Sequence, residues 1–289
     1  MRIDAHQHYW RIERGDYGWI TPDLPVLYRD FSPQDLLPHL KQHQLDGSIA
    51  VQAAPTLAET DYLLSLADTD DSILGVVGWL DLHDPEHRSH YERFSRHPKF
   101  VGFRIMIQEM PDASSILEPS FLEALSAYAA EDVPIDLLVV SHQLPPLVRL
   151  LERVPHLRGV IDHLAKPRIA EGATAPWLSY MREIAAHPKL YCKLSGMVTE
   201  ADHRHWKQAD FTFYIRQILE LFGPQRVMFG SDWPVCLLAA SYDQTMSVLQ
   251  QAIPDSWSEQ ERTLLFGENA RTFYKLNDVS RKLKEGERL

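Results

Sequence analysis

Arg2-Ile3-Asp4-Ala5-His6-Gln7-His8-Tyr9-Trp10 opens the chain as a short apolar strand that ends in two histidines. Successive side chains of a strand point to opposite faces, so Asp4, His6 and His8 are predicted to share one face. Two histidines at this spacing converge on one point, which suits a divalent metal or a polar substrate. A second apolar run, MFGSDWP from residue 228 to 234, ends in Asp232 before a turn. Together the two runs favour a shared polar site over unrelated buried histidines.

Strand-like and helix-like runs alternate along the whole chain. The predicted strands are Arg2–Ala5, Ser48–Gln52, Leu74–Leu82, Val101–Ile107, Ile135–Val140, Gly159–Asp162, Leu190–Leu194 and Val227–Gly230. The predicted helices are Ser32–His43, Ala58–Thr69, Pro85–Arg96, Pro119–Ala130, Pro145–Val154, Pro176–Ala186, Phe211–Phe222, Tyr242–Ala252 and Ser258–Tyr274. Strands that are each followed by a helix imply a parallel sheet with right-handed crossovers. Because no G-x-G-x-x-G follows the first strand, this α/β pattern predicts a (β/α)8 TIM barrel rather than a dinucleotide-binding sheet.

The chain reads as a single domain. No internal repeat or polar linker divides it, so we predict a barrel over residues 1–276 and a charged C-terminal tail over 277–289. The aromatic stretch from Tyr9 to Phe31 contains prolines at 22 and 25, which predicts a loop covering one end of the barrel.

Composition limits the kinds of partner. The 289 residues carry a net charge of −11 without a basic cluster outside the tail, which argues against nucleic acid and anionic membranes. The N-terminus runs straight into a strand without a leader pattern, and no apolar run could span a bilayer, so we expect a cytoplasmic protein. Cys192 and Cys236 lie in apolar segments and are predicted to be reduced and buried. A small molecule is the expected partner, and a monomer or a homo-oligomer fits equally well.

Polar residues stand at the ends of six of the eight predicted strands, where a core would not need them. They are His6 and His8, Arg104, His142, His163 with Lys166, Lys193 with Ser195, and Asp232. Chemistry in TIM barrels sits at the C-terminal ends of the strands, and an unpaired buried charge is costly. We therefore predict one shared site, although Lys193 lies mid-strand and its side chain could instead reach the opposite end of the barrel.

These motifs resemble the amidohydrolase superfamily. D-x-H-x-H at 4–8, His163 and GSDWP at 230–234 carry that resemblance. HQHYW at 6–10, DHLAKP at 162–167 and KLSG at 193–196 are closest to the sugar-lactonase group, which includes L-fuconolactonase and L-rhamnonolactonase and is related to 2-pyrone-4,6-dicarboxylate lactonase. The resemblance covers residues 4–234, almost the whole predicted barrel.

The resemblance implies a metal site with one departure from the family. Two-metal members use a bridging lysine at the end of strand four, where this chain has Arg104, a poor metal ligand. A single divalent ion, with Zn²⁺ as the first choice, is therefore expected on His6, His8 and Asp232, with Glu109 or His142 as a further ligand. Catalysis without a metal is the alternative, as in some relatives.

Each candidate residue is given a role by its chemistry and position. Asp232 is the predicted general base, and Arg104 is predicted to bind the substrate and stabilise the oxyanion. His163 is predicted to polarise the lactone carbonyl or protonate the leaving alkoxide. The predicted substrate contacts also include Lys166, Trp10, Trp233 and His142, with the aromatic residues Tyr9, Trp19 and Trp79 as further candidates for a sugar-stacking wall.

The leading hypothesis is hydrolysis of a sugar-derived lactone, such as L-fuconolactone, to the open-chain acid. A metal-dependent non-oxidative decarboxylase of an unsaturated acid and a catalytically silent carbohydrate-binding barrel are the alternatives. Substrate choice is expected to lie in the loops Tyr9–Phe31, Ala53–Thr60, Glu109–Leu117 and Gly196–Ala209, whose conformations the sequence does not define.

Overall fold

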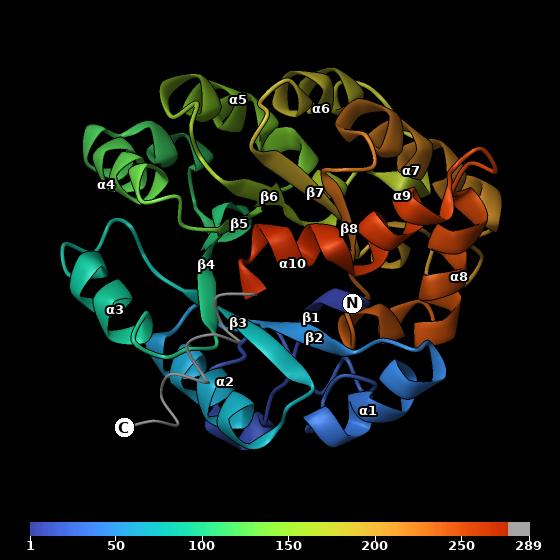
Figure 1. Cartoon of the computed structure of the whole chain (residues 1–289), viewed down its shortest axis with the longest axis horizontal. Coiled ribbons are helices and arrows are strands. Elements are labelled where there is room, and N and C mark those ends of the chain that lie inside the picture. Colours follow the sequence, from blue (N-terminus) through green and yellow to red (C-terminus); the bar gives the residue numbers. More distant parts are fainter. Residues whose placement is uncertain (277–289) are drawn as a thin grey trace.

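The computed structural model describes residues 1–276 and shows a ring of eight parallel strands surrounded by helices (Figure 1). The predicted tail, 277–289, lies outside the described residues. The strands pair in chain order: β1 (Ile3–Gln7), β2 (Gly47–Val51), β3 (Ile73–Trp79), β4 (Phe100–Met106), β5 (Ile135–Leu138), β6 (Gly159–Ile161), β7 (Leu190–Leu194) and β8 (Val227–Phe229). The prediction of a (β/α)8 barrel is confirmed.

The helices cover the outside of the ring and one of its ends (Figure 1). They are α1 (Pro33–Gln42), α2 (Leu57–Thr69), α3 (His87–Phe94), α4 (Pro119–Ala130), α5 (Leu144–Arg153), α6 (Trp177–Ala185), α7 (Gln208–Phe222), α8 (Tyr242–Ala252), α9 (Glu259–Thr263) and α10 (Asn269–Phe273). Serine followed by proline at 32–33 is a typical helix start, and Ser32 forms a capping box with Asp35 at the N-terminus of α1. Cys192 and Cys236 are free and buried, as predicted.

The last predicted helix is interrupted. A π-helical turn, Leu264–Glu268, separates α9 from α10, so the prediction of one helix over Ser258–Tyr274 is wrong. Gly267 there has non-helical dihedral angles, and a Cβ at this position would lie 2.1 Å from the backbone oxygen of Met1. The start of the chain therefore packs against this turn, and only glycine leaves room for it.

Helix α10 lies across the N-terminal end of the barrel. Its residues Ala270 and Phe273 pack with Ile3, Ala5 and Met228 in an apolar cluster inside the ring, and α10 crosses the middle of the ring in Figure 1. This end of the barrel is therefore filled by side chains, which leaves the C-terminal ends of the strands for chemistry. None of the helices in residues 1–276 combines the length and the apolar character that crossing a bilayer requires.

The ring closes through a short contact between the ends of β1 and β8. The backbone N–H of His8 donates to Trp233 O over 2.8 Å, and that of Asp232 donates to His6 O, also over 2.8 Å. The barrel therefore closes at the level of His6, His8 and Asp232, the three predicted metal ligands.

A bulge in β1 turns Asp4 away from the two histidines. Asp4 pairs with Ser48 but Gln7 pairs with Ala50, so three steps on β1 match two on β2. Ile3 and Ala5 point into the barrel, whereas Asp4 between them accepts a hydrogen bond from the Tyr242 hydroxyl of α8. The prediction that Asp4 shares a face with His6 and His8 is wrong because the bulge interrupts the alternation.

Replacing Asp4 should open the seam between β1 and β8. Its Oδ1 accepts from the backbone N–H groups of Ser231 (2.9 Å) and His6 (3.2 Å), and its Oδ2 accepts from Tyr242 (3.0 Å). Asp4→Ala leaves three buried donors without this partner at about 1–3 kcal/mol each, so we expect a loss of at least about 3 kcal/mol in urea unfolding. Tyr242→Phe, which deletes one hydroxyl, should cost about 1 kcal/mol. Equal losses in the two variants would contradict this role of Asp4.

Candidate active site

A cavity of about 180 Å³ opens at the C-terminal ends of the strands. Its charged and polar wall includes His8, Arg104, His163 and Asp232, which come from four different strand ends. Gln108, Glu109 and Lys166 complete that wall, and Trp19, Met106, Leu138 and Val235 form its apolar part. The loops that follow β1, β2, β4, β6 and β8 thus contribute to the cavity, whereas the predicted contribution of Gly196–Ala209 is not found among its lining residues.

Three of the predicted metal ligands converge at the base of this cavity. His6 Nε2 lies 3.2 Å from His8 Nε2 and 3.8 Å from Asp232 Oδ1, and His8 Nε2 lies 3.2 Å from the same carboxylate oxygen. A tetrahedral ion with bonds of about 2.0–2.1 Å holds its ligand atoms roughly 3.3–3.4 Å apart. The three atoms therefore have the chemistry and nearly the spacing of one face of such a site.

The two histidines are oriented by contacts on their other ring nitrogens. His8 Nδ1 donates to the backbone oxygen of Val51 over 2.7 Å, which leaves a lone pair on Nε2. His6 Nδ1 faces Asp162 Oδ1 at 3.3 Å and Lys193 Nζ at 3.1 Å. Burial, followed by the charge of Lys193, holds the pKa of His6 well below its usual value, so the ring is neutral. Neutral rings with fixed outer nitrogens are the form that binds a metal.

A buried group of charges supports this centre from below. Lys193 Nζ contacts Asp136 and lies 3.2 Å from Asp162 Oδ1, and Asp136 also accepts from the Tyr274 hydroxyl over 2.8 Å. The two carboxylates and the ammonium are fully buried, so each charge depends on its partners. Lys193 thus points to the centre of the barrel and contacts His6, and does not reach the opposite end.

The KLSG motif also positions His163. Ser195 Oγ lies 2.9 Å from His163 Nδ1, and a Cβ on Gly196, whose φ is +61°, would lie only 2.5 Å from that nitrogen. The imidazole therefore packs against the end of β7, with Nε2 turned to Asp232 Oδ1 at 3.9 Å. Burial lowers the pKa of His163 to about 4, so the ring is neutral at pH 7.

The turns that carry His163 and Asp232 have an unusual backbone. Residues 163 to 166 all have positive φ angles between 48° and 57°, and Asp232 has a φ of 56°. The left-handed conformation costs a non-glycine residue roughly 1–2 kcal/mol. Such strain persists where the surrounding structure holds a side chain in place, and here it aims His163, Lys166 and Asp232 at one cavity.

Arg104 crosses the cavity floor with two of its nitrogens already occupied. Nη2 donates to the backbone oxygen of Gln52, and Nη1 donates to Asp162 Oδ2 over 3.3 Å. These contacts fix the plane of the guanidinium, which also lines the cavity. Asp162 therefore joins Arg104 to Lys193 and His6, a function that the sequence did not predict for it.

Asp232 is ionised in this setting. Burial by itself raises the pKa of its carboxyl, but the surrounding imidazole rings of His163, His8 and His6 outweigh burial and hold that pKa below its usual range. Asp232 is therefore ionised over the whole physiological pH range.

Two predicted aromatic contacts need correction. Trp10 is fully buried between Trp19 and Phe31, and its Nε1 donates to the backbone oxygen of Arg29 over 2.8 Å. Trp233 is 2% exposed and packs edge-on against Phe31. Neither lines the cavity, because both fill the space beneath the loop that follows β1. Trp19 reaches the cavity instead.

The remaining predicted residues divide between the cavity and the surface. Lys166 lines the cavity and lies 4.0 Å from Glu200 Oε1. Glu109 also lines it. Among the described residues, the side chains close enough to share a metal are His6, His8 and Asp232, and His6, Asp162 and His163, so Glu109 is in neither group. His142 is exposed and lines a separate hollow with Arg168, so its predicted metal and substrate contacts are corrected. Gln108 was not singled out from the sequence, since a glutamine after a strand carries no distinctive signal.

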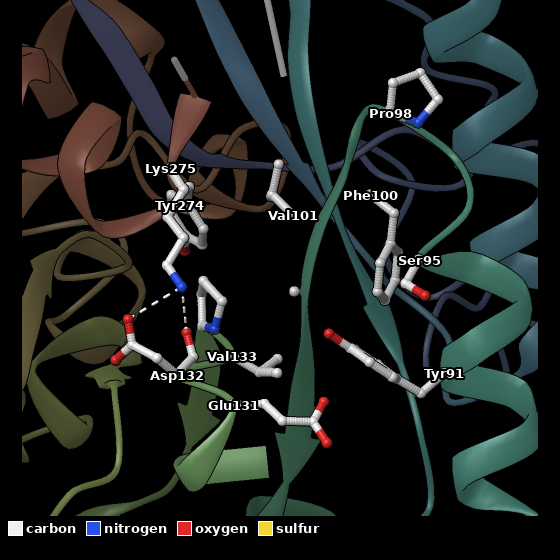
Figure 2. A pocket seen from close by; sticks show the side chains of 12 residues that line it. Tyr91, Ser95, Pro98, Phe100, Val101, Glu131, Asp132, Val133, Tyr274 and Lys275 are labelled. Carbon is white, nitrogen blue, oxygen red and sulfur yellow. Dashed lines mark hydrogen bonds and ion pairs between the residues drawn. The ribbon is translucent and has the colours of Figure 1, made fainter. Parts of the chain in front are cut away.

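A hollow at the opposite end of the barrel lacks these features. It measures about 160 Å³ and is lined by Tyr91, Phe100, Asp132 and Lys275, among others (Figure 2). Its charges are paired: Lys275 Nζ lies 3.0 Å from Asp132 Oδ2, as the dashed lines show, and Arg158 also binds Asp132 over 2.6 Å. The convergent histidines and carboxylates lie only at the other end of the described barrel.

Comparison with known proteins identifies the family. A family model described as amidohydrolase matches residues 3–276. The chain belongs to the amidohydrolase family. Its relatives include two proteins named L-fucono-1,5-lactonase: one from Burkholderia ambifaria, 39% identical over 97% of both chains, and one from Burkholderia multivorans, 41% identical over 96% of both. A crystal structure of a Burkholderia multivorans amidohydrolase with bound zinc has a TM-score of 0.88 and 41% identity, covering 95% of this chain and 99% of the other.

Removing the hydroxyl of Ser195 tests whether it orients His163. We expect Ser195→Ala to lower kcat by about 10- to 100-fold, as is typical when a group that orients a site histidine is lost. The control is Ser48→Ala, because Ser48 is also a buried strand serine and accepts from Gln7 Nε2 on the outside of the barrel. Steady-state kinetics should show no kcat change in the control. Equal effects on kcat in both variants would refute a specific role for Ser195.

Proposed function

We propose that this protein hydrolyses L-fucono-1,5-lactone, or a closely similar sugar lactone, to the open-chain acid. The broader prediction of a sugar-lactone hydrolase is confirmed by two full-length relatives with this named activity. The observation that supports the mechanism is the ionised Asp232 at the meeting point of His6 and His8, in the cavity that also contains Arg104.

The cavity suits one sugar ring. Its volume of about 180 Å³ is below the roughly 300–1,000 Å³ of sites for drug-sized ligands. Gln108 Oε1 is buried and has no hydrogen-bond partner in the described part of the chain, so it can accept from a substrate hydroxyl. The apolar side chains of Met106, Leu138 and Val235 suit the methyl group of a 6-deoxy sugar.

We propose that His6, His8 and Asp232 hold one Zn²⁺ ion. Their spacing, the neutral His6 ring and the outer hydrogen bond of His8 fit such an ion, and the similar Burkholderia multivorans protein has been crystallised with zinc. When bound, the ion supplies Lewis-acid chemistry to the substrate carbonyl and to water. Catalysis by the side chains alone is the alternative.

The protein's own residues provide the proton transfers. Asp232 accepts a proton from the water that attacks the lactone carbonyl carbon. As the C–O bond forms, negative charge develops on the carbonyl oxygen, and the Arg104 guanidinium stabilises it. The ring C–O bond then breaks, and His163, with Nε2 3.9 Å from Asp232 Oδ1, passes the proton from Asp232 to the leaving ring oxygen. The product is a hydroxy acid, which ionises and acidifies the solution.

Replacing Asp232 by asparagine tests the base. We expect Asp232→Asn to lower kcat on L-fucono-1,5-lactone by about 10²- to 10⁴-fold, because the amide cannot accept the proton. Acid release is followed with a pH indicator after subtraction of the uncatalysed rate, and Asp132→Asn, at the opposite end of the barrel, is the control. An Asp232→Asn variant with wild-type kcat would rule out this base, and a wild type silent on every aldonolactone would rule out the function.

Metal removal tests the proposed ion. Dialysis against a chelator should remove about one zinc per chain and lower kcat at least about tenfold, and one equivalent of Zn²⁺ should restore it. Metal content and melting temperature are measured on the same samples, and His8→Ala should fail to retain zinc. Full activity in a chain that contains no metal would establish the metal-independent alternative.

A further inference from the structure

Trp19 is the one tryptophan in the described chain that both lines the cavity and is substantially exposed. Its side chain is 38% exposed, and its indole N–H donates to the backbone oxygen of Ala53 over 2.9 Å. The ring packs edge-on against the buried Trp10, with centroids 5.6 Å apart. This arrangement presents a flat apolar surface beside the charged and polar wall of the cavity.

The residues next to Trp19 are held by one buried carboxylate, that of Glu59 in the first turn of α2. Its Oε1 accepts from the backbone N–H of Ala53 over 3.0 Å, and its Oε2 accepts from the Tyr17 hydroxyl over 2.6 Å. The backbone oxygen of Ala53 accepts the hydrogen bond from the Trp19 indole, and Tyr17 lies two residues before Trp19 in the same loop. Glu59 therefore fixes both the loop that carries Trp19 and the carbonyl that binds it.

Neighbouring contacts strengthen the same connection. The Thr56 hydroxyl donates to Asp16 Oδ2 over 3.3 Å and accepts from the backbone N–H of Glu59 over 3.0 Å. Arg14 lies 2.6 Å from Asp16 and 3.8 Å from Glu59. The loop after β1 and the start of α2 are thus joined by polar contacts at consecutive positions, directly behind the wall of the cavity.

Glu59 itself has no contact with the reacting groups. It is fully buried, both of its oxygens are occupied, and it does not line the cavity. Burial raises its pKa to about 7, so this carboxyl is held in place at an energetic cost. An apolar side chain could fill the position but could not bind Ala53 and Tyr17 together.

We propose that Glu59 is a positioning residue for substrate binding, and that through Tyr17 and Ala53 it holds Trp19 as the surface on which the sugar ring stacks. The aliphatic C–H face of a six-membered ring packs on the indole, while its hydroxyl groups face the polar wall. This deepens, and rests on, the proposed sugar-lactone function. Stacking is equally strong in the ground state and the transition state, so it affects KM and not kcat.

Steady-state kinetics with L-fucono-1,5-lactone tests the proposal. Trp19→Ala should raise KM about tenfold with kcat changed less than about threefold. Glu59→Gln and Tyr17→Phe should raise KM in the same direction by a smaller factor. In a Trp19→Ala background neither should change KM further, because both act through the indole. A KM effect of Glu59→Gln that persists without Trp19, or an unchanged KM in Trp19→Ala, would overturn the proposal.

Two controls separate positioning from loss of stability and from failure of the proposed chemistry. Tyr128→Phe removes another tyrosine hydroxyl, one that contacts His87 Nδ1 over 2.8 Å away from the cavity; it should lower the melting temperature as Tyr17→Phe does and leave KM unchanged. Calorimetric binding of 1,5-anhydro-L-fucitol, a ring without the carbonyl, needs no turnover. If the wild type binds this ring but hydrolyses no lactone, and Trp19→Ala and Glu59→Gln weaken the binding, the proposed function is refuted while the stacking surface stands. Equal binding by all forms, or by none, refutes the stacking surface.

Discussion

The arrangement of the site depends on how β1 and β8 are held together. The two strands are joined by few backbone hydrogen bonds, of which that from Asp232 to the oxygen of His6 is central. Asp4 accepts from the backbone of Ser231 and of His6, so one carboxylate binds both strands just below the site. The distances between the side chains of His6, His8 and Asp232 are therefore set by the seam of the barrel. An enzyme that relies on such distances needs them to be insensitive to movements of the outer loops.

The second constraint is charge compensation inside the ring. Lys193 and Arg104 share Asp162, and Lys193 also contacts Asp136, so two cations and two carboxylates are buried together. Each charge alone would be expensive in this environment, but as a group they are paired. The consequence for chemistry is that His6 has a lowered pKa and remains neutral, with its inner nitrogen available. The buried charges thus stabilise the barrel and prepare the histidine at the same time.

The two ends of the barrel differ in packing: one is filled by apolar side chains, and the other carries the polar cavity. At the N-terminal end α10 and the side chains of Ile3 and Met228 form an apolar plug, and half-buried charges near it, such as Asp132 and Lys275, pair with one another. At the C-terminal end the strands finish in polar residues that converge without filling the space, and the loop after β1 covers it. Stability and reactivity are therefore separated along the barrel axis.

The sequence by itself determined the strand–helix alternation, the cap of α1 at Ser32 and the motif residues that face the cavity. These features are local: periodicity, capping and residue chemistry are readable within a few positions. Most of the barrel and the core of the candidate site, including Asp232, were predictable in this way.

Only the tertiary structure decided which side chains meet. The bulge in β1 depends on pairing with β2, and it alone turns Asp4 outward. Trp10 and Trp19 belong to the same loop, yet packing buries the first and places the second at the cavity. Glu59 looks like an ordinary helix-start residue until Ala53 and Tyr17 are folded onto it. The physical reason is that facing direction and burial arise from contacts between segments distant in the chain, which no local pattern encodes.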